Sequence, residues 1–147
     1  LAAIYRPLNN IFLNVLMERI RKKYICKNQI KKGTGGVREL LKLYKNGHSI
    51  ALMIDQRVRE GIKSKFFNEV AFTTTIPAQF IKKFNCKVVP IFIERYNGTN
   101  FNIIVQKPIE FSKDTSREKI TRELNIWLEE MIMKNPGKWI WSHNRWK

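Results

Sequence analysis

Two short, continuous apolar runs place the strongest limit on how this chain can fold. They span residues 49–54 and 88–93, and each is long enough for one strand but far shorter than the ~20 apolar residues that a membrane-spanning helix needs. Runs of this kind are typical of strands that are buried on both faces. Because segments with helical spacing surround them, the sequence predicts an α/β fold in which helices flank a mixed sheet.

Helical spacing and turn residues predict the other elements. Apolar residues recur at helical intervals in four segments, namely residues 11–20, 37–44, 76–84 and 115–135. We expect Thr34-Gly35-Gly36 to interrupt the chain before the second helix, and Asn46-Gly47 to end that helix. Asn97-Gly98 predicts a tight hairpin turn between a strand over residues 86–94 and a strand over residues 101–106.

Two further segments hold much of the remaining apolar content. Residues 55–75 are predicted to be a loop, although they include Phe66, Phe67 and Phe72. The longest predicted helix begins with Thr115 or Ser116 as its cap. We expect six residues of that helix to face the core: Ile120, Leu124, Trp127, Leu128, Met131 and Ile132.

Length and composition bound the class of protein. A chain of 147 residues predicts one domain, and a hydrophobic content of 44% excludes a disordered basic tail. The two cysteines, Cys26 and Cys86, are too few for a disulfide framework, and no residue spacing is typical of a zinc site.

The charge is strongly positive, with 28 Lys and Arg against 12 Asp and Glu, or +16. Three kinds of partner fit this charge: nucleic acid, an anionic membrane surface, and an acidic protein or phosphorylated substrate. The alternative explanation for part of the excess is base composition, because an AT-rich genome would favour Lys, Ile and Asn, which are the commonest residues here. The cations are spread along the chain, so charge alone does not choose among these partners.

Few residues are candidates for catalysis. Asp55 follows the first apolar run, and open α/β sheets bind ligands beyond the carboxyl ends of their strands. Asp55 either positions a basic catalytic group, pairs with an arginine, or caps the turn after the strand. His48 and His143 are the only histidines, and neither has an acidic residue within a helical turn downstream. No serine nucleophile motif and no metal-ligand cluster is present in the sequence.

The C-terminal tail is rich in tryptophan. Three of the four tryptophans lie between residues 139 and 146, next to Lys138, Arg145 and Lys147. Tryptophan beside cations suits a membrane interface or stacking on nucleic-acid bases. The alternative is a segment that is docked on the core and fills volume with its tryptophans.

Taken together, these segments resemble the late lipid A acyltransferases, the lauroyl- and myristoyltransferases of Gram-negative envelope synthesis. The resemblance rests on Tyr5-Arg6-Pro7 with Asn10, the Arg19/Arg21 pair, Gly36-Val37-Arg38, Asp55-Gln56, Phe66-Phe67, Thr73 to Thr75, Val89-Pro90, and the ending Trp141-x-His143-x-Arg145-x-Lys147. Where the family pattern reads Pro-Phe-Phe-Gly, this chain has Lys65-Phe66-Phe67-Asn68.

The resemblance implies a fold like that of the glycerolphosphate acyltransferases and transfer of a fatty acyl chain to a hydroxyl of a lipid A precursor. The implied donor is acyl carrier protein, which is acidic, or coenzyme A, and no cofactor is implied. The implied partners are that carrier, a phosphorylated glycolipid acceptor and an anionic membrane surface, but not nucleic acid. The implied location is the cytoplasmic face of the bacterial inner membrane.

The family's catalytic signature is a histidine followed five positions later by Asp or Glu, in which the carboxylate orients the imidazole and the imidazole takes the hydroxyl proton. Five positions after His48 stands Met53, which is not acidic. We therefore expect no catalytic residue within these 147 residues, and we expect the motif to lie before Leu1. The chain then corresponds to the C-terminal part of one acyltransferase domain. Alone it is expected to be inactive.

The resemblance carries over to a small set of residues. Arg21, or Arg19 in a register shifted by two, matches an arginine implicated in activity, and Asp55 matches the aspartate at the end of a strand. Arg6, Arg145 and Lys147 are expected to contact phosphates, since guanidinium binds phosphate bidentately. Two rival hypotheses are a catalytically inactive, membrane-docking relative and a basic nucleic-acid-binding protein.

Overall fold

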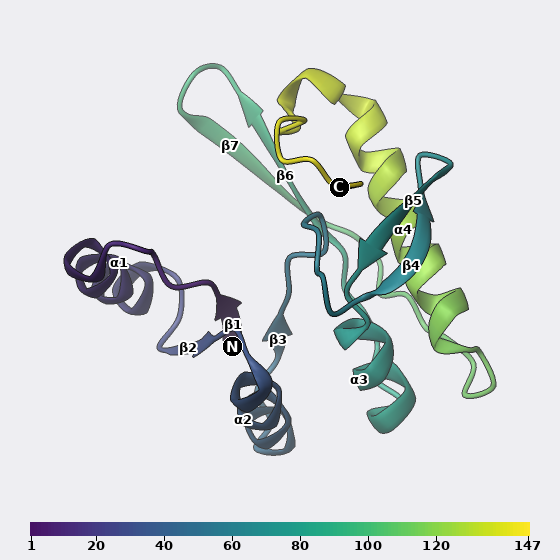
Figure 1. The fold of residues 1–147 in the computed structure, drawn as a ribbon, viewed down its shortest axis with the longest axis horizontal. Helices are drawn as coiled ribbons and strands as arrows, with labels where there is room; N and C mark the ends of the chain where they lie inside the picture. The colour runs from purple at the N-terminus through teal and green to yellow at the C-terminus, as the bar shows by residue number, and fades with distance from the viewer. The chain divides into compact units, whose positions relative to one another are not determined.

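The computed structural model describes residues 1–147, except for the side chain of Thr34, and shows an α/β fold (Figure 1). The α/β class predicted from the sequence is confirmed. The predicted mixed sheet is wrong in detail, because the strands form three small sheets, one parallel and two antiparallel. The chain divides into two compact units, Leu1–Met53 and Ile54–Lys147, which we describe separately. The predicted organisation as part of one domain stays a prediction.

The first unit is a small parallel α/β arrangement. Its elements are β1 (Ala2–Tyr5), α1 (Ile11–Tyr24), β2 (Asn28–Lys31), α2 (Thr34–Lys45) and β3 (Ile50–Ala51). The strand order is β2-β1-β3, and both outer strands run parallel to β1. The connection from β1 to β2 and the connection from β2 to β3 therefore run in opposite directions across the sheet, as in doubly wound folds.

Local signals explain where the two helices of this unit begin and end. The Asn10 side chain accepts a hydrogen bond from the backbone N–H of Leu13 at 3.1 Å and caps α1. Asn46 and Gly47 end α2 as predicted, with Gly47 at φ +81°. The predicted interruption at residues 34–36 is wrong, because α2 begins at Thr34. A Cβ at Gly36 would collide with the backbone oxygen of Lys31, so this glycine allows the helix to start close to β2.

The first predicted strand is much shorter than expected. Only Ile50–Ala51 pair with β1, and no residue of the run 49–54 is buried. The apolar run therefore does not form a strand that is covered on both faces. The apolar composition of this run is typical of a buried strand, but whether the run is buried depends on which other segments of the chain cover it.

The second unit is built from two hairpins, two helices and the C-terminal tail. Its elements are β4 (Ile62–Phe66), β5 (Glu69–Thr73), α3 (Ile76–Phe84), β6 (Ile91–Tyr96), β7 (Asn100–Val105), α4 (Arg117–Lys134) and the short 3-10 helix η1 (Pro136–Lys138). Both strand pairs are antiparallel. The predicted helix over residues 76–84 is confirmed by α3.

The hairpin β4–β5 corrects the prediction of a loop over residues 55–75. Its turn residues Phe67 and Asn68 both have positive φ, at 50° and 63°. A phenylalanine in this conformation is unusual, which is why the turn was missed. Asn68 stands where the family pattern has glycine, and asparagine is among the few residues that adopt this conformation readily.

The second hairpin confirms one prediction and corrects another. Asn97 and Gly98 form the predicted turn, with φ of 43° and 72°. The preceding strand starts later than expected, at Ile91, and is not buried. Every residue of β7 is exposed.

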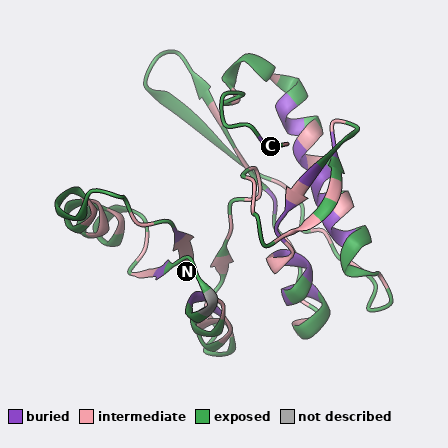
Figure 2. Cartoon of the chain, viewed as in Figure 1, coloured by how far each residue is buried: buried purple, intermediate pink, exposed green. Residues whose placement is uncertain are grey.

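Helix α4 supplies most of the core of the second unit. Ser116 caps it, accepting a hydrogen bond from the N–H of Lys119 at 3.1 Å. Five of its six predicted core residues are buried: Ile120, Leu124, Leu128, Met131 and Ile132. Trp127 is only partly buried. Figure 2 shows the buried residues in a row along α4 and none along α1.

The tryptophan-rich tail is docked on this core. Trp139 and Trp146 pack against the cluster that contains Phe66, Ala71, Leu128 and Ile132. The indole N–H of Trp146 donates to the backbone oxygen of Phe66 at 3.0 Å. Of the three uses proposed for the tail, the structure supports packing on the core.

Candidate functional site

A polar cluster lies between β1 and α1 in the first unit. The Tyr5 hydroxyl at the carboxyl end of β1 donates to Glu18 Oε1 at 2.6 Å, and Asn14 Nδ2 donates to the same oxygen at 2.8 Å. Lys31 Nζ lies 3.6 Å from that oxygen. Three donors therefore converge on one carboxylate next to the end of the central strand.

The pKa values of both titrating groups in this cluster, Glu18 and Tyr5, are shifted. The hydrogen bonds from Tyr5 and Asn14 lower the pKa of Glu18 below its ordinary value. Burial, together with the hydrogen bond to Glu18, raises the pKa of Tyr5 to about 12. At neutral pH Glu18 is therefore an ionised acceptor and Tyr5 keeps its proton.

Arg21 and Arg19, the two alternatives for the predicted arginine, lie on different sides of α1. The Arg21 guanidinium lies over the Tyr5 ring, 5.0 Å from its centroid, and its Nη1 is buried with no hydrogen-bond partner among the described residues. Arg19 is exposed on the other side of the helix. Arg21 is thus the arginine that joins the cluster, while its role in activity stays a prediction.

Arg6 directly follows Tyr5, at the carboxyl end of the central strand, and is exposed. In doubly wound sheets, ligands bind at this end, where connections leave in opposite directions. The position of Arg6 is compatible with a contact to an anionic ligand, and the contact itself stays a prediction.

Arg145 of the second unit is fully buried. Its Nη1 donates to the backbone oxygens of Gln56 at 2.5 Å and Phe72 at 2.9 Å, and its Nη2 donates to Ile54 O at 3.3 Å and Thr73 Oγ1 at 3.2 Å. The guanidinium also lies over the ring of Phe66. Arg145 therefore ties the tail to the segment after residue 53 and to β5.

This placement does not fit the predicted contact between Arg145 and a substrate phosphate. The Arg145 side chain has no exposed surface and makes four hydrogen bonds within the chain, and its Nε, which has no partner among the described residues, is buried as well, so the guanidinium offers no exposed donor to a ligand. We therefore assign Arg145 a structural role. Lys147, the other predicted phosphate contact in the tail, is exposed, and its role stays a prediction.

Asp55 lies in the same region as Arg145. Burial lowers the pKa of Arg145 and the charge of Asp55 raises it, so the carboxylate helps to keep the buried guanidinium ionised. Asp55 Oδ1 and Arg57 Nε are buried atoms with no hydrogen-bond partner among the described residues. The effect of Asp55 on the pKa of Arg145 is compatible with pairing with an arginine, one of the alternatives for Asp55, and a role in substrate binding stays a prediction.

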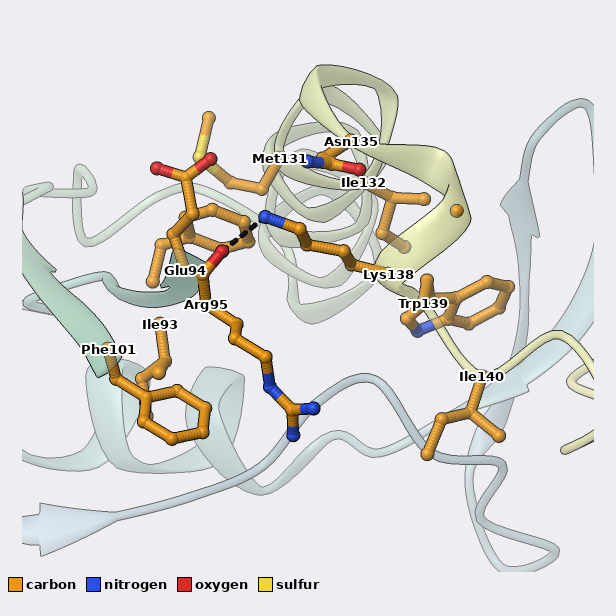
Figure 3. Close-up of a pocket in the computed structure, with 12 residues that line it drawn as sticks. Ile93, Glu94, Arg95, Phe101, Met131, Ile132, Asn135, Lys138, Trp139 and Ile140 are labelled. Carbon is orange, nitrogen blue, oxygen red and sulfur yellow. Dashed lines mark hydrogen bonds between the residues drawn. The ribbon is translucent and has the colours of Figure 1, made fainter. Parts of the chain in front are cut away.

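A groove of about 520 Å³ lies between the β6–β7 hairpin and the C-terminal end of α4 (Figure 3). Its walls include the apolar residues Phe92, Ile93, Phe101, Met131, Ile132, Trp139 and Ile140. Arg95 and Lys138 also line it, together with Glu94. The Lys138 ammonium donates to the backbone oxygen of Arg95, and the Arg95 guanidinium lies 5.1 Å from the centroid of the Phe101 ring.

This groove was not predicted from the sequence. The signal that could have indicated it is the hairpin itself, in which apolar residues occur at neighbouring positions such as Ile103 and Ile104, so that both faces are apolar. The groove has one wall near residue 93 and another near residue 139, and no pattern in the sequence brings those two segments together.

Comparison with known families identifies the chain. A sequence model of the bacterial lipid A biosynthesis acyltransferases matches residues 1–147. The chain belongs to this family. No curated protein matches the chain. The family named from the sequence motifs is confirmed, and with it an acyltransferase function in lipid A biosynthesis at the general level.

In a lipid A biosynthesis acyltransferase, the accepting hydroxyl must lose a proton to a base. His48 Nδ1 lies 3.4 Å from the backbone oxygen of Asn46, and His143 is exposed. Among the described side chains, no carboxylate is hydrogen-bonded to either imidazole. Neither histidine therefore has the orienting partner that this chemistry uses.

Two kinds of feature are absent from the described residues of this family member. No group of three or more His, Cys, Asp or Glu side chains there is arranged to hold a metal ion. No helix within those residues combines the length and apolar character required to cross a membrane.

Proposed function

We propose that this chain takes part in moving a fatty acyl group from a thioester donor to a hydroxyl of a phosphorylated lipid A precursor at the cytoplasmic face of the inner membrane. The family match over residues 1–147 is the observation that carries this proposal. The hydroxyl oxygen forms a bond to the acyl carbon, the carbon–sulfur bond breaks, and the hydroxyl proton passes through a base to the leaving thiolate.

The groove between the β6–β7 hairpin and α4 is the proposed site of the acyl chain. Its walls are predominantly apolar and its volume of about 520 Å³ lies within the range of small-ligand sites. Each buried methylene contributes about 0.8 kcal/mol to the binding of a lipid chain. A longer acyl chain is therefore expected to bind more tightly until the groove is filled.

The cations of the chain are the proposed contacts for the charged parts of both substrates. Lys138 and Arg95 line the groove, and the Lys138 ammonium keeps donors beyond the one used for the Arg95 carbonyl. Arg6 and Lys147 are exposed, and Arg21 has a buried nitrogen without a hydrogen-bond partner among the described residues. Phosphate is the group shared by the carrier-protein donor, the coenzyme A donor and the glycolipid acceptor.

Neither His48 nor His143 is the proposed general base, because in the part of the chain that the structure describes no carboxylate is hydrogen-bonded to either imidazole. The 147 residues by themselves are expected to transfer no acyl group from lauroyl-acyl carrier protein to a lipid A precursor. Detectable transfer would contradict this expectation, and the variants His48→Ala and His143→Ala would then show which imidazole is the base.

Binding of acyl-coenzyme A esters of 8, 12 and 16 carbons tests the groove separately from turnover. The dissociation constant is expected to fall by up to about 15-fold for each two methylenes that become buried. Phe101→Asp, within the groove, is expected to abolish this dependence on chain length. Val105→Asp is the matched control, because Val105 is an exposed apolar residue of the same strand that does not line the groove. Equal affinity for all three esters would contradict the proposed acyl site.

A further inference from the structure

Helix α1 packs against its unit with its polar side. Only four of its fourteen residues are not exposed, namely Asn14, Met17, Glu18 and Arg21. Their spacing of i, i+3, i+4 and i+7 places them on one side of the helix. Glu18 on this side accepts the hydrogen bond from Tyr5, so the side that faces β1 is held mainly by polar contacts.

The opposite side of α1 carries large apolar residues in solvent. In its first two turns, Ile11 is 77% exposed, Phe12 is 88% exposed, and Val15 and Leu16 are about half exposed at 49% and 53%. In most amphipathic helices such residues pack against the core of the protein. Here the apolar side is the free side.

Cations follow on the same side towards the end of the helix. Arg19, Lys22 and Lys23 are all exposed, and at 100° per residue they fall within the arc that Ile11 and Leu16 define. Among the described side chains, none forms an ion pair with any of the three. The first turn carries no acidic residue, and Glu18, the one acidic residue of the helix, lies on the polar side.

We propose that this outward side of α1 docks the chain on an anionic lipid surface. Ile11, Phe12, Val15 and Leu16 enter the boundary between head groups and acyl chains, while Arg19, Lys22 and Lys23 remain at the level of the lipid phosphates. Helices that bind in a membrane interface combine an apolar side with Lys and Arg in this way, and they bury the apolar side by about 5–10 Å. Charge complementarity selects anionic lipid over neutral lipid as the occupant.

The inference rests on the geometry of α1 and not on acyl transfer. It is tested by co-sedimentation of the 147-residue chain with vesicles of phosphatidylcholine alone and of phosphatidylcholine with about 30% phosphatidylglycerol. Neither lipid is an acyl thioester or a lipid A precursor, so binding to these vesicles is independent of acyl transfer. We expect strong preference for the anionic vesicles and a loss of binding as salt is raised, since salt screens the cations.

Two double variants separate the apolar from the charged contribution. Ile11→Asp with Phe12→Asp is expected to weaken partitioning by about 10- to 100-fold, because two apolar side chains no longer enter the lipid. Lys22→Gln with Lys23→Gln is expected to weaken it by about 30-fold at low salt. All four positions are exposed, so folding, checked by circular dichroism, is expected to persist.

The matched control removes two lysines from the other helix of the same unit. Lys42 and Lys45 of α2 are exposed, and Lys42→Gln with Lys45→Gln is expected to change partitioning by less than about 3-fold, although it removes the same charge. Equal binding of neutral and anionic vesicles, or equal losses in both lysine variants, would overturn the proposal. Variants of α1 that bind vesicles normally but lose affinity for acyl carrier protein would also overturn it, and would assign this side of α1 to an acidic protein partner.

Discussion

Helices α1 and α4 both carry apolar residues at helical spacing, but α4 buries its apolar side and α1 turns its polar side towards its own unit. In α4 the residues that are buried are mostly apolar, such as Ile120 and Leu128. In α1 the residues that are not exposed are Asn14, Met17, Glu18 and Arg21, whereas the apolar positions lie in solvent (Figure 2). Helical periodicity therefore identifies an element and its two sides, but does not say which side its own unit covers.

The two units also differ in how they hold polar groups. In the first unit, the contact between Tyr5 and Glu18 lies at a partly exposed boundary. In the second unit, the guanidinium of Arg145 has no exposed surface and is bonded to backbone oxygens. The expected effects of substitution on stability therefore decrease from the buried Arg145 to the partly exposed Glu18.

The largest effect is expected for Arg145→Ala. The substitution leaves the carbonyls of Gln56 and Phe72 without their donor and removes the positive charge near Asp55, so the free energy of unfolding is expected to fall by about 3–5 kcal/mol. Urea denaturation measures this change. Arg145→Lys is expected to recover only part of it, because an ammonium cannot reproduce a planar fork of donors. Full stability of the alanine variant would contradict the structural role.

The next effect compares the two helices directly. Ile120→Ala in α4 is expected to lower the free energy of unfolding by about 2–5 kcal/mol, because Ile120 is fully buried. Ile11→Ala in α1 makes the same chemical change at a residue that is 77% exposed, and is expected to stay within about 0.5 kcal/mol of the parent chain. Comparable losses in both variants would show that the apolar side of α1 is covered in the folded chain.

The smallest effect concerns the polar side of α1 and depends on pH. The pKa of Glu18 is lowered in the folded state by the hydrogen bonds from Tyr5 and Asn14, so its contribution to stability is present above its ordinary pKa of 4.5. That contribution is lost as the pH falls below 4.5 towards the lower folded-state pKa. Denaturation curves of Glu18→Gln are expected to show a weaker loss of stability between pH 5 and pH 3 than those of the parent chain. Identical pH profiles would show that the Tyr5–Glu18 contact does not form.

Elements with local signals were predictable from the sequence. The caps Asn10 and Ser116 and the turn Asn97-Gly98 each act within a few residues, and the elements next to them were found. The β4–β5 hairpin was missed because its turn uses Phe67 in a conformation that few residues of that kind adopt. The run 49–54 was composed like a buried strand but is not covered, because burial is decided by distant segments.

The candidate sites show the same division. The family could be named from short motifs, and Asp55 was chosen for its place after an apolar run. The choice between Arg19 and Arg21 needed the phase of α1, which places Arg21 over the Tyr5 ring. Arg145 was taken for a substrate contact because a sequence does not show that a tail folds back onto β5. The groove near Phe101 and Trp139 joins segments that are far apart in the chain.

Hydroxyl-radical footprinting of the unmodified chain shows which side of α1 is in contact with solvent. The rate of side-chain oxidation follows solvent exposure, and mass spectrometry resolves it by residue. We predict that Phe12 and Leu16 are oxidised at rates close to those in the unfolded chain, while Leu124 and Ile132 of α4 are protected. Protection of Phe12 and Leu16 to the level of Leu124 would contradict this orientation of α1, because its apolar side would then be covered by the protein itself.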